Sequence, residues 1–122
     1  MRKVLIIDDD TKNIFALTAT LKAKDFATVS AGSAQDGINL IQKDASISVV
    51  LMDMMMPDMD GYEAIREIRN DNKYKHLPVI AVTAQAMQGD KEQCLAAGAD
   101  HYIAKPIDVD TLLILLKEYI KM

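Results

Sequence analysis

Carboxylates follow two apolar runs of the sequence. Asp8 and Asp9 come directly after residues 4–7, and Asp53 comes directly after residues 49–52. If these runs are neighbouring parallel strands, three ionised carboxylates meet within a few ångströms and repel one another. A divalent cation relieves this repulsion, and short oxygen ligands suit Mg²⁺, with Mn²⁺ as an alternative. The spacing therefore predicts a metal site that leaves room for phosphate.

Two other apolar runs end in groups that bind phosphate. Thr83 follows residues 79–82, and Lys105 follows residues 102–104. A carboxylate beside a divalent cation, an ammonium and a hydroxyl is the set that phosphoryl transfer needs to neutralise charge. Asp53 stands alone at the end of its run, whereas Asp8 and Asp9 form a pair. Asp53 is therefore the candidate nucleophile, and an acyl phosphate would be its product.

The elements that must position these residues are predicted from hydrophobic periodicity. Runs rich in β-branched residues predict five short strands, at residues 4–7, 26–29, 49–52, 79–82 and 102–104. Apolar residues recur at helical spacing between them. Alternating strands and helices predict the α/β class, with a parallel sheet and helices on both faces. Ligands of such sheets bind at the carboxyl ends of the strands.

The predicted helices differ in how clearly the sequence marks them. Ser33 and Asp108 are predicted N-caps, with Asp36 completing a capping box. The fourth helix, residues 89–97, has only a thin apolar stripe, formed by Met87, Cys94 and Leu95. The last helix has a buried stripe and two apolar residues outside it. Its stripe is Val109, Leu112, Leu113, Leu116 and Ile120, and the two outside it are Ile114 and Leu115.

Composition excludes several classes of protein. The chain has 122 residues, which predicts one domain over residues 1–122. Its net charge of -4 argues against direct nucleic-acid binding. Because no apolar run reaches the ~20 residues that span a bilayer, we expect no membrane segment and a cytoplasmic location. The single cysteine, Cys94, excludes an intrachain disulfide.

Four separated motifs together resemble one known family, the receiver domains of two-component response regulators, over essentially the whole chain. The motifs are Ile6-Ile7-Asp8-Asp9-Asp10, Leu51-Met52-Asp53-Met54-Met55-Met56-Pro57-Asp58-Met59-Asp60-Gly61, Val82-Thr83-Ala84 and Lys105-Pro106. The resemblance implies a flavodoxin-like sheet with strand order 2-1-3-4-5. The stretch from Thr83 to Met87 also resembles receivers of hybrid histidine kinases, so the chain can be read as a stand-alone regulator or as an excised receiver.

The resemblance also implies roles for the acidic residues. Asp53 becomes the phosphoacceptor, which takes a phosphoryl group from the phosphohistidine of a histidine kinase or a histidine-phosphotransfer protein. Asp8 and Asp9 become the acidic pair that binds Mg²⁺ together with Asp53. The backbone carbonyl of Met55 becomes a further ligand of the metal ion.

The other motif residues are assigned to phosphoryl binding and switching by the same resemblance. Thr83, Lys105 and the backbone N–H of Ala84 would bind the phosphoryl oxygens, with a cis peptide bond at Lys105-Pro106. Tyr102 would be the switch aromatic, with Thr83. The face of the fourth helix, fifth strand and fifth helix would then change its affinity for a partner. We expect a monomer, or a weak dimer that depends on phosphorylation.

Three alternative interpretations remain at this point. An aspartate-nucleophile phosphatase uses similar groups, but the cap that shields its substrate has no counterpart here and the acidic pair, Asp8 and Asp9, is adjacent in sequence, so we expect no turnover enzyme. A degenerate receiver used as a scaffold would not need the intact site. Asp58-Met59-Asp60-Gly61 with Glu67 overlaps part of a calcium-binding loop, but Met56 stands at its first ligand position.

Overall fold

The computed structural model describes residues 2–84 and 89–120. Its sheet has five strands that all run parallel, in the order β2-β1-β3-β4-β5. The strands are β1 (Lys3–Ile7), β2 (Ala27–Ala31), β3 (Ile47–Asp53), β4 (Val79–Thr83) and β5 (His101–Ala104). The strand order predicted from the family resemblance is confirmed.

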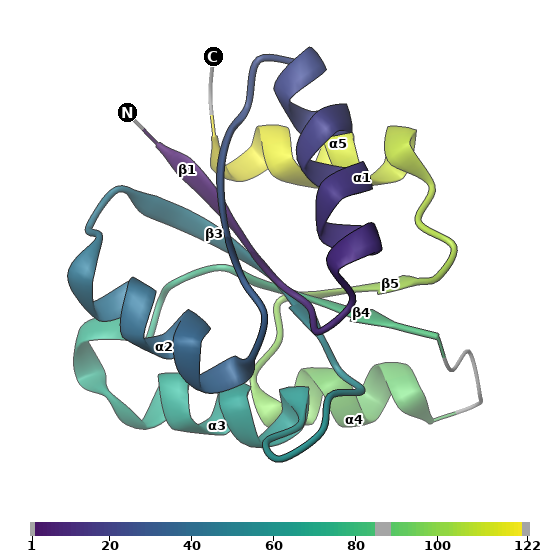
Figure 1. The fold of residues 1–122 in the computed structure, drawn as a ribbon. Helices are drawn as coiled ribbons and strands as arrows, with labels where there is room; N and C mark the ends of the chain where they lie inside the picture. Colours follow the sequence, from purple (N-terminus) through teal and green to yellow (C-terminus); the bar gives the residue numbers. More distant parts are fainter. Residues whose placement is uncertain (1, 85–88, 121–122) are drawn as a thin grey trace.

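Five α-helices cover the two faces of the sheet (Figure 1). They are α1 (Thr11–Ala23), α2 (Ala34–Lys43), α3 (Gly61–Asn70), α4 (Asp90–Ala97) and α5 (Val109–Tyr119), with a short 3-10 helix, η1, at Asn72–Tyr74. Helices α1 and α5 lie on one face, and α2, α3 and α4 lie on the other (Figure 1). None of the helices in the described part of the chain is both long and apolar enough to cross a membrane.

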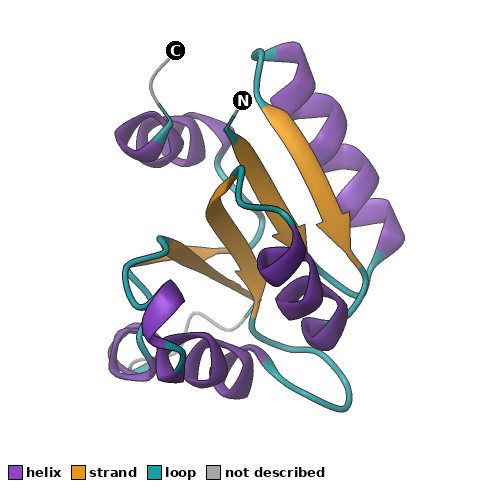
Figure 2. Cartoon of the chain, turned by 90° about the vertical axis from the view of Figure 1, so that its left-hand side faces the viewer, coloured by secondary structure: helices purple, strands orange, loops and turns teal. Residues whose placement is uncertain are grey.

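The central strands are buried on both faces because helices cover each side of the sheet. Along β1, Val4 and Ile6 pack toward α1 and α5, whereas Leu5 and Ile7 pack toward α2, α3 and α4. This alternation follows from the two-residue period of a strand. It explains why the strands read as continuous apolar runs. All five strands point the same way, so their carboxyl ends meet at one edge (Figure 2).

The second strand differs from the prediction. It begins at Ala27, one residue later than predicted, and ends at Ala31. Phe26 instead packs into the core beneath α1 and α5, and its N–H donates to the Leu21 carbonyl at 2.9 Å. Phe26 therefore closes the end of α1, a role that an apolar β-forming residue does not reveal in sequence.

Three helix starts also test the prediction. Ser33 caps α2 as expected, by accepting the Asp36 N–H at 3.2 Å. Asp108 occupies the N-cap position of α5, but its carboxylate accepts the Thr111 hydroxyl at 2.7 Å instead of a helix N–H. Helix α4 begins at Asp90, one residue later than predicted, and Gly89 precedes it with a φ of 98°. Met87, which was predicted to contribute to its apolar stripe, lies outside the described residues.

Candidate functional site

The pairing of β1 with β3 brings two carboxylates to the same point. Ile7 is paired with Met52, so the next residues, Asp8 and Asp53, leave the sheet side by side. Both side chains come from buried strands, and each residue is only 4% exposed. Asp9, which is exposed, completes the group: carboxylate oxygens of all three residues lie within 4.8 Å of one another.

This oxygen-only donor set fits the metal that was predicted. Three carboxylates at this separation repel one another unless a cation lies between them. Hard ligands on short side chains favour Mg²⁺ over the softer transition metals, which prefer nitrogen and sulfur. Asp8, Asp9 and Asp53 are therefore the residues of the described structure that fit a divalent cation.

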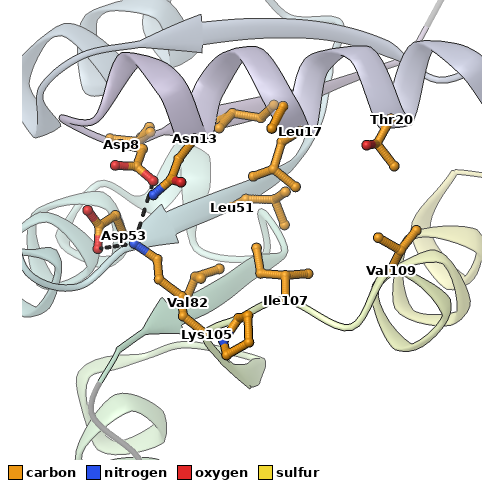
Figure 3. Close-up of a pocket in the computed structure, with 14 residues that line it drawn as sticks. Asp8, Asn13, Leu17, Thr20, Leu51, Asp53, Val82, Lys105, Ile107 and Val109 are labelled. Carbon is orange, nitrogen blue, oxygen red and sulfur yellow. Dashed lines mark ion pairs between the residues drawn. The ribbon is translucent and has the colours of Figure 1, made fainter.

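Lys105 supplies a positive charge at the same edge. Its ammonium lies 3.5 Å from Asp53 Oδ1 and 3.7 Å from Asp8 Oδ2, as the dashed lines of Figure 3 mark. The backbone places it there: β5 pairs Ala104 with Thr83 of β4, and the Lys105 N–H donates to the Thr83 carbonyl at 2.8 Å. The peptide bond between Lys105 and Pro106 is cis, as the resemblance implied.

The environment of Asp53 disfavours its charged form. Burial raises its pKa to about 6, and the nearby Asp8 carboxylate acts in the same direction. The Met55 N–H, which donates to Asp53 Oδ1 at 3.2 Å, and the Lys105 ammonium partly oppose this shift. A carboxylate in this state is poised to be neutralised, either by a proton or by a bound cation.

Comparison with known proteins shows the family to which the chain belongs. The family model for the response regulator receiver domain matches residues 4–117, which lie within the domain predicted over residues 1–122. The chain belongs to this family. The receiver domain is also 31% identical to the polar-differentiation response regulator DivK of Brucella ovis over 119 residues, which cover 98% of this chain and 96% of DivK.

Solved structures similar to the receiver domain include the chemotaxis protein CheY4 of Vibrio cholerae, with a TM-score of 0.89 and 28% identity over 98% of this chain and 99% of CheY4. The receiver of the sensor histidine kinase PA1611 of Pseudomonas aeruginosa, with magnesium in its active-site cleft, has a TM-score of 0.87 and 31% identity over 97% and 96% of the chains. The Ssk1 receiver of Saccharomyces cerevisiae, crystallised with the histidine phosphotransfer protein Ypd1, has a TM-score of 0.88 and 25% identity over 97% and 88%. This receiver domain is therefore a module of two-component phosphorelays.

The residues predicted to bind the phosphoryl group lie at this edge of the receiver domain, whereas Tyr102, the predicted switch aromatic, lies two residues before the end of β5. Thr83 ends β4 and is 2% exposed, and Ala84 follows it in an exposed bend. Tyr102 lies opposite Ala81 in the pairing of β4 with β5, and it packs against the core beneath α2, α3 and α4. Residues 85–87 of the stretch that resembles receivers of hybrid histidine kinases, among them Gln85, lie outside the described residues.

The loop between β3 and α3 holds the remaining predicted ligand. Met55, whose carbonyl is the predicted ligand, is 51% exposed, whereas Met54 and Met56 on either side are buried.

Asp60 caps α3 by accepting the Glu63 N–H at 2.9 Å, so it opens a helix, and a strand precedes the loop. The calcium-loop alternative requires a helix at that place, and it is therefore wrong.

A pocket of about 520 Å³, which no pattern in the sequence indicates, continues from this site (Figure 3). Asn13, Leu17 and Thr20 of α1 line one side of it, and Ile107 and Val109 line another. The spacing of Asn13, Leu17 and Thr20 places them on one face of a helix, which the sequence does show. It does not show that the loop after β5 lies opposite that face.

Proposed function

We propose that this receiver domain accepts a phosphoryl group on Asp53 from the phosphohistidine of a histidine kinase or a histidine-phosphotransfer protein. The observation that supports this most directly is the group of three carboxylates within 4.8 Å of one another, with the Lys105 ammonium 3.5 Å from Asp53. The Ssk1 receiver in complex with Ypd1 supports the class of partner. The PA1611 receiver with magnesium supports the choice of cation.

In the proposed reaction, an oxygen of the Asp53 carboxylate attacks the phosphorus atom. A P–O bond forms, the P–N bond to the donor imidazole breaks, and that nitrogen keeps the electron pair. Asp8, Asp9, Asp53 and the Met55 carbonyl would hold Mg²⁺, which neutralises charge on the transferred oxygens. Lys105, Thr83 and the Ala84 N–H would bind those oxygens from the protein side.

The proposed response to phosphorylation is a change of packing on one face. The new phosphoryl group adds charge and acceptor oxygens beside Lys105 and Thr83. Movement of Thr83 toward them would let Tyr102 turn inward. This would change the face formed by α4, β5 and α5, and with it the affinity for a downstream partner or a second receiver. We propose a signalling role without turnover of an external substrate.

The first experiment measures intact mass after incubation with acetyl phosphate, with and without Mg²⁺. We expect the gain of one phosphoryl group only when Mg²⁺ is present, and we expect the Asp53→Asn variant to gain none. A beryllofluoride binding test separates a short-lived adduct from a site that does not react. A chain that shows neither an adduct nor beryllofluoride binding would support the scaffold interpretation instead.

A second assay tests the proposed absence of turnover. Asp8 and Asp10 have the spacing of a D-x-D motif, but Asp10 Oδ1 accepts the Lys12 N–H at 2.9 Å as the N-cap of α1, so its carboxylate is engaged at the helix start. We therefore expect no multiple turnover of a phosphate ester such as p-nitrophenyl phosphate. Sustained release of nitrophenol that disappears in Asp53→Asn would favour the hydrolase interpretation. The assay and the mass measurement use the same protein and the same Mg²⁺ concentration, so their results can be compared directly.

A further inference from the structure

The pocket beside Asp53 extends well beyond the atoms that phosphoryl transfer uses. It runs from the carboxyl ends of β1 and β3 along the channel between α1 and the loop after β5 (Figure 3). Its volume of about 520 Å³ falls within the range of pockets that bind small molecules. Leu17, Leu51 and Ile107 supply apolar walls from three different elements.

The polar end of this pocket carries a net negative charge. Asp8, Asp53 and Lys105 line it, and Asp9 has a carboxylate oxygen within 4.8 Å of the other two carboxylates. Three carboxylates and one ammonium leave an excess of two negative charges, because Lys105 can balance only one of them. A second cation is therefore attracted to this end, whereas an anion is repelled.

We infer that this pocket binds small organic cations with an apolar body, of the class of aryl-alkyl amines. The ammonium of the ligand would lie at Asp8 and Asp53, where its three N–H donors match carboxylate oxygens. The aryl group would lie against Leu17, Leu51 and Ile107, where it removes apolar surface from water. The pocket thus combines a charged end with apolar walls, whereas an acidic cluster alone would offer only the charge.

Binding of an amine in this pocket would affect the metal site. An ammonium at Asp8 and Asp53 occupies the same carboxylates that fit Mg²⁺, so the two cations exclude one another. The amine would therefore act as a competitive antagonist of the metal ion. Binding of the amine requires no phosphoryl transfer, so it can be tested separately from the proposed function.

The test uses isothermal titration calorimetry with phenethylamine as the probe, in metal-free buffer. We expect saturable binding with one site per chain, and an apparent Kd that rises in proportion to added Mg²⁺. Phenylpropionate has the same aryl body with a carboxylate, and ethylamine has the ammonium without the body. Both should bind at least about tenfold more weakly than phenethylamine, because phenylpropionate lacks the ammonium and ethylamine lacks the aryl group.

Two matched variants of α1 locate the site. Ala16 and Ala19 are both exposed on this helix, but Ala16 lines the pocket and Ala19 does not. Ala16→Phe should fill the channel and weaken phenethylamine binding about tenfold, and Ala19→Phe should leave it unchanged. Circular dichroism verifies that both variants are folded.

Several results would overturn the inference. These are the lack of saturable phenethylamine binding, equal affinity for phenylpropionate, indifference to Mg²⁺, or equal effects of the two α1 variants. Failure of acetyl phosphate labelling in a protein that still binds phenethylamine would overturn the proposed function alone. Labelling without amine binding would overturn this inference alone.

Discussion

Burial and the neighbouring Asp8 carboxylate raise the pKa of Asp53 to about 6, against an ordinary value of 3.8. In the unfolded chain both influences are absent, so the carboxyl group binds its proton less tightly there. Between about pH 4 and 6 the folded, metal-free protein therefore holds more protons at this residue than the unfolded chain. The stability contributed by Asp53 falls as the pH rises through this window, and the charged form opposes folding above it.

Asp53→Asn should therefore stabilise the metal-free protein at neutral pH. The amide has the same shape and no charge, so we expect about 1 kcal/mol of added stability at pH 7 and little difference near pH 4. Urea unfolding in the presence of EDTA, at a series of pH values, measures this gap. If the difference in unfolding free energy between Asp53→Asn and the wild type narrowed as the pH rose, this would contradict the raised pKa of Asp53.

Gly61 illustrates how one small residue fixes the loop after Asp53. A Cβ atom at this position would lie 2.6 Å from the Met54 Cα and 2.9 Å from the Asp53 carbonyl oxygen. These are backbone atoms, which cannot move aside without displacing the loop that carries Met55. The close approach of α3 to β3 thus depends on the absence of a side chain.

Gly61→Ala should destabilise the protein by about 2 kcal/mol, because the added methyl group overpacks this contact. It should also lower the yield of the Mg²⁺-dependent phosphoryl adduct by moving the predicted Met55 ligand. Gly32→Ala is the matched control, since a Cβ there would meet nothing within 4 Å. Thermal unfolding and intact mass report the two effects, and equal behaviour of both variants would argue against the close approach.

At the scale of elements, Arg69 joins four segments at the end of the sheet opposite the site. Its guanidinium donates to the carbonyls of Tyr74, Leu77 and Gly98 at 3.0, 2.7 and 2.9 Å, and to Asp100 Oδ2 at 3.0 Å. Asp100 Oδ2 also accepts the Val79 N–H at 2.8 Å. Helix α3, η1 and the beginnings of β4 and β5 are thereby held together.

Arg69→Met should cost about 3 kcal/mol of stability, because several partly buried carbonyls would lose their donor. Arg66→Met, at an exposed position of the same helix, serves as the control and should cost far less. Urea unfolding measures both variants. A similar loss of unfolding free energy in Arg69→Met and Arg66→Met would mean that the hydrogen bonds of Arg69 contribute little to stability.

The strand ends of the site could be predicted from the sequence, whereas the roles of some single side chains could not. Strand ends were predictable because apolar runs stop abruptly at Asp8, Asp53 and Thr83, and parallel strands bring such ends to one edge. The role of Phe26 could not be predicted, because its apolar side chain suits a strand and a helix end equally well. The Asp108 side chain had two partners within reach, the Thr111 hydroxyl and the helix N–H groups, and sequence does not rank them.

The pocket required information that local patterns do not contain. The apolar face of α1 at Leu17 is visible in the sequence as part of a helical stripe. That this face lies across a channel from Ile107 depends on how the loop after β5 leaves the sheet. Contacts between segments so distant in the chain follow from the whole topology.

At the scale of the whole molecule, the carboxylates of the site repel one another in the absence of a cation. A ligand that binds only the folded protein stabilises it by mass action. We expect Mg²⁺ at a hundred times its Kd to add about 2.7 kcal/mol to the free energy of unfolding. Asp53→Asn, which removes one charged ligand, should lose most of this gain.

Thermal unfolding at increasing Mg²⁺ concentration tests this expectation in the wild type and the variant. Matched additions of NaCl at equal ionic strength separate binding from general screening. Equal midpoints in Mg²⁺ and NaCl would contradict a specific site. The same series verifies that EDTA reverses the effect.

Backbone hydrogen bonds join β5 to β4 at both ends of β5. The Asp100 N–H donates to the Val79 carbonyl at 2.8 Å before the strand, and the Lys105 N–H donates to the Thr83 carbonyl at 2.8 Å after it. With both ends held, β5 cannot slide along its neighbour without breaking a backbone hydrogen bond. In the proposed switch, a signal that crosses this strand would therefore travel by rotation of side chains over a fixed main chain. Amide hydrogen exchange at Asp100 and Lys105 should accordingly stay slow whether or not the domain is phosphorylated.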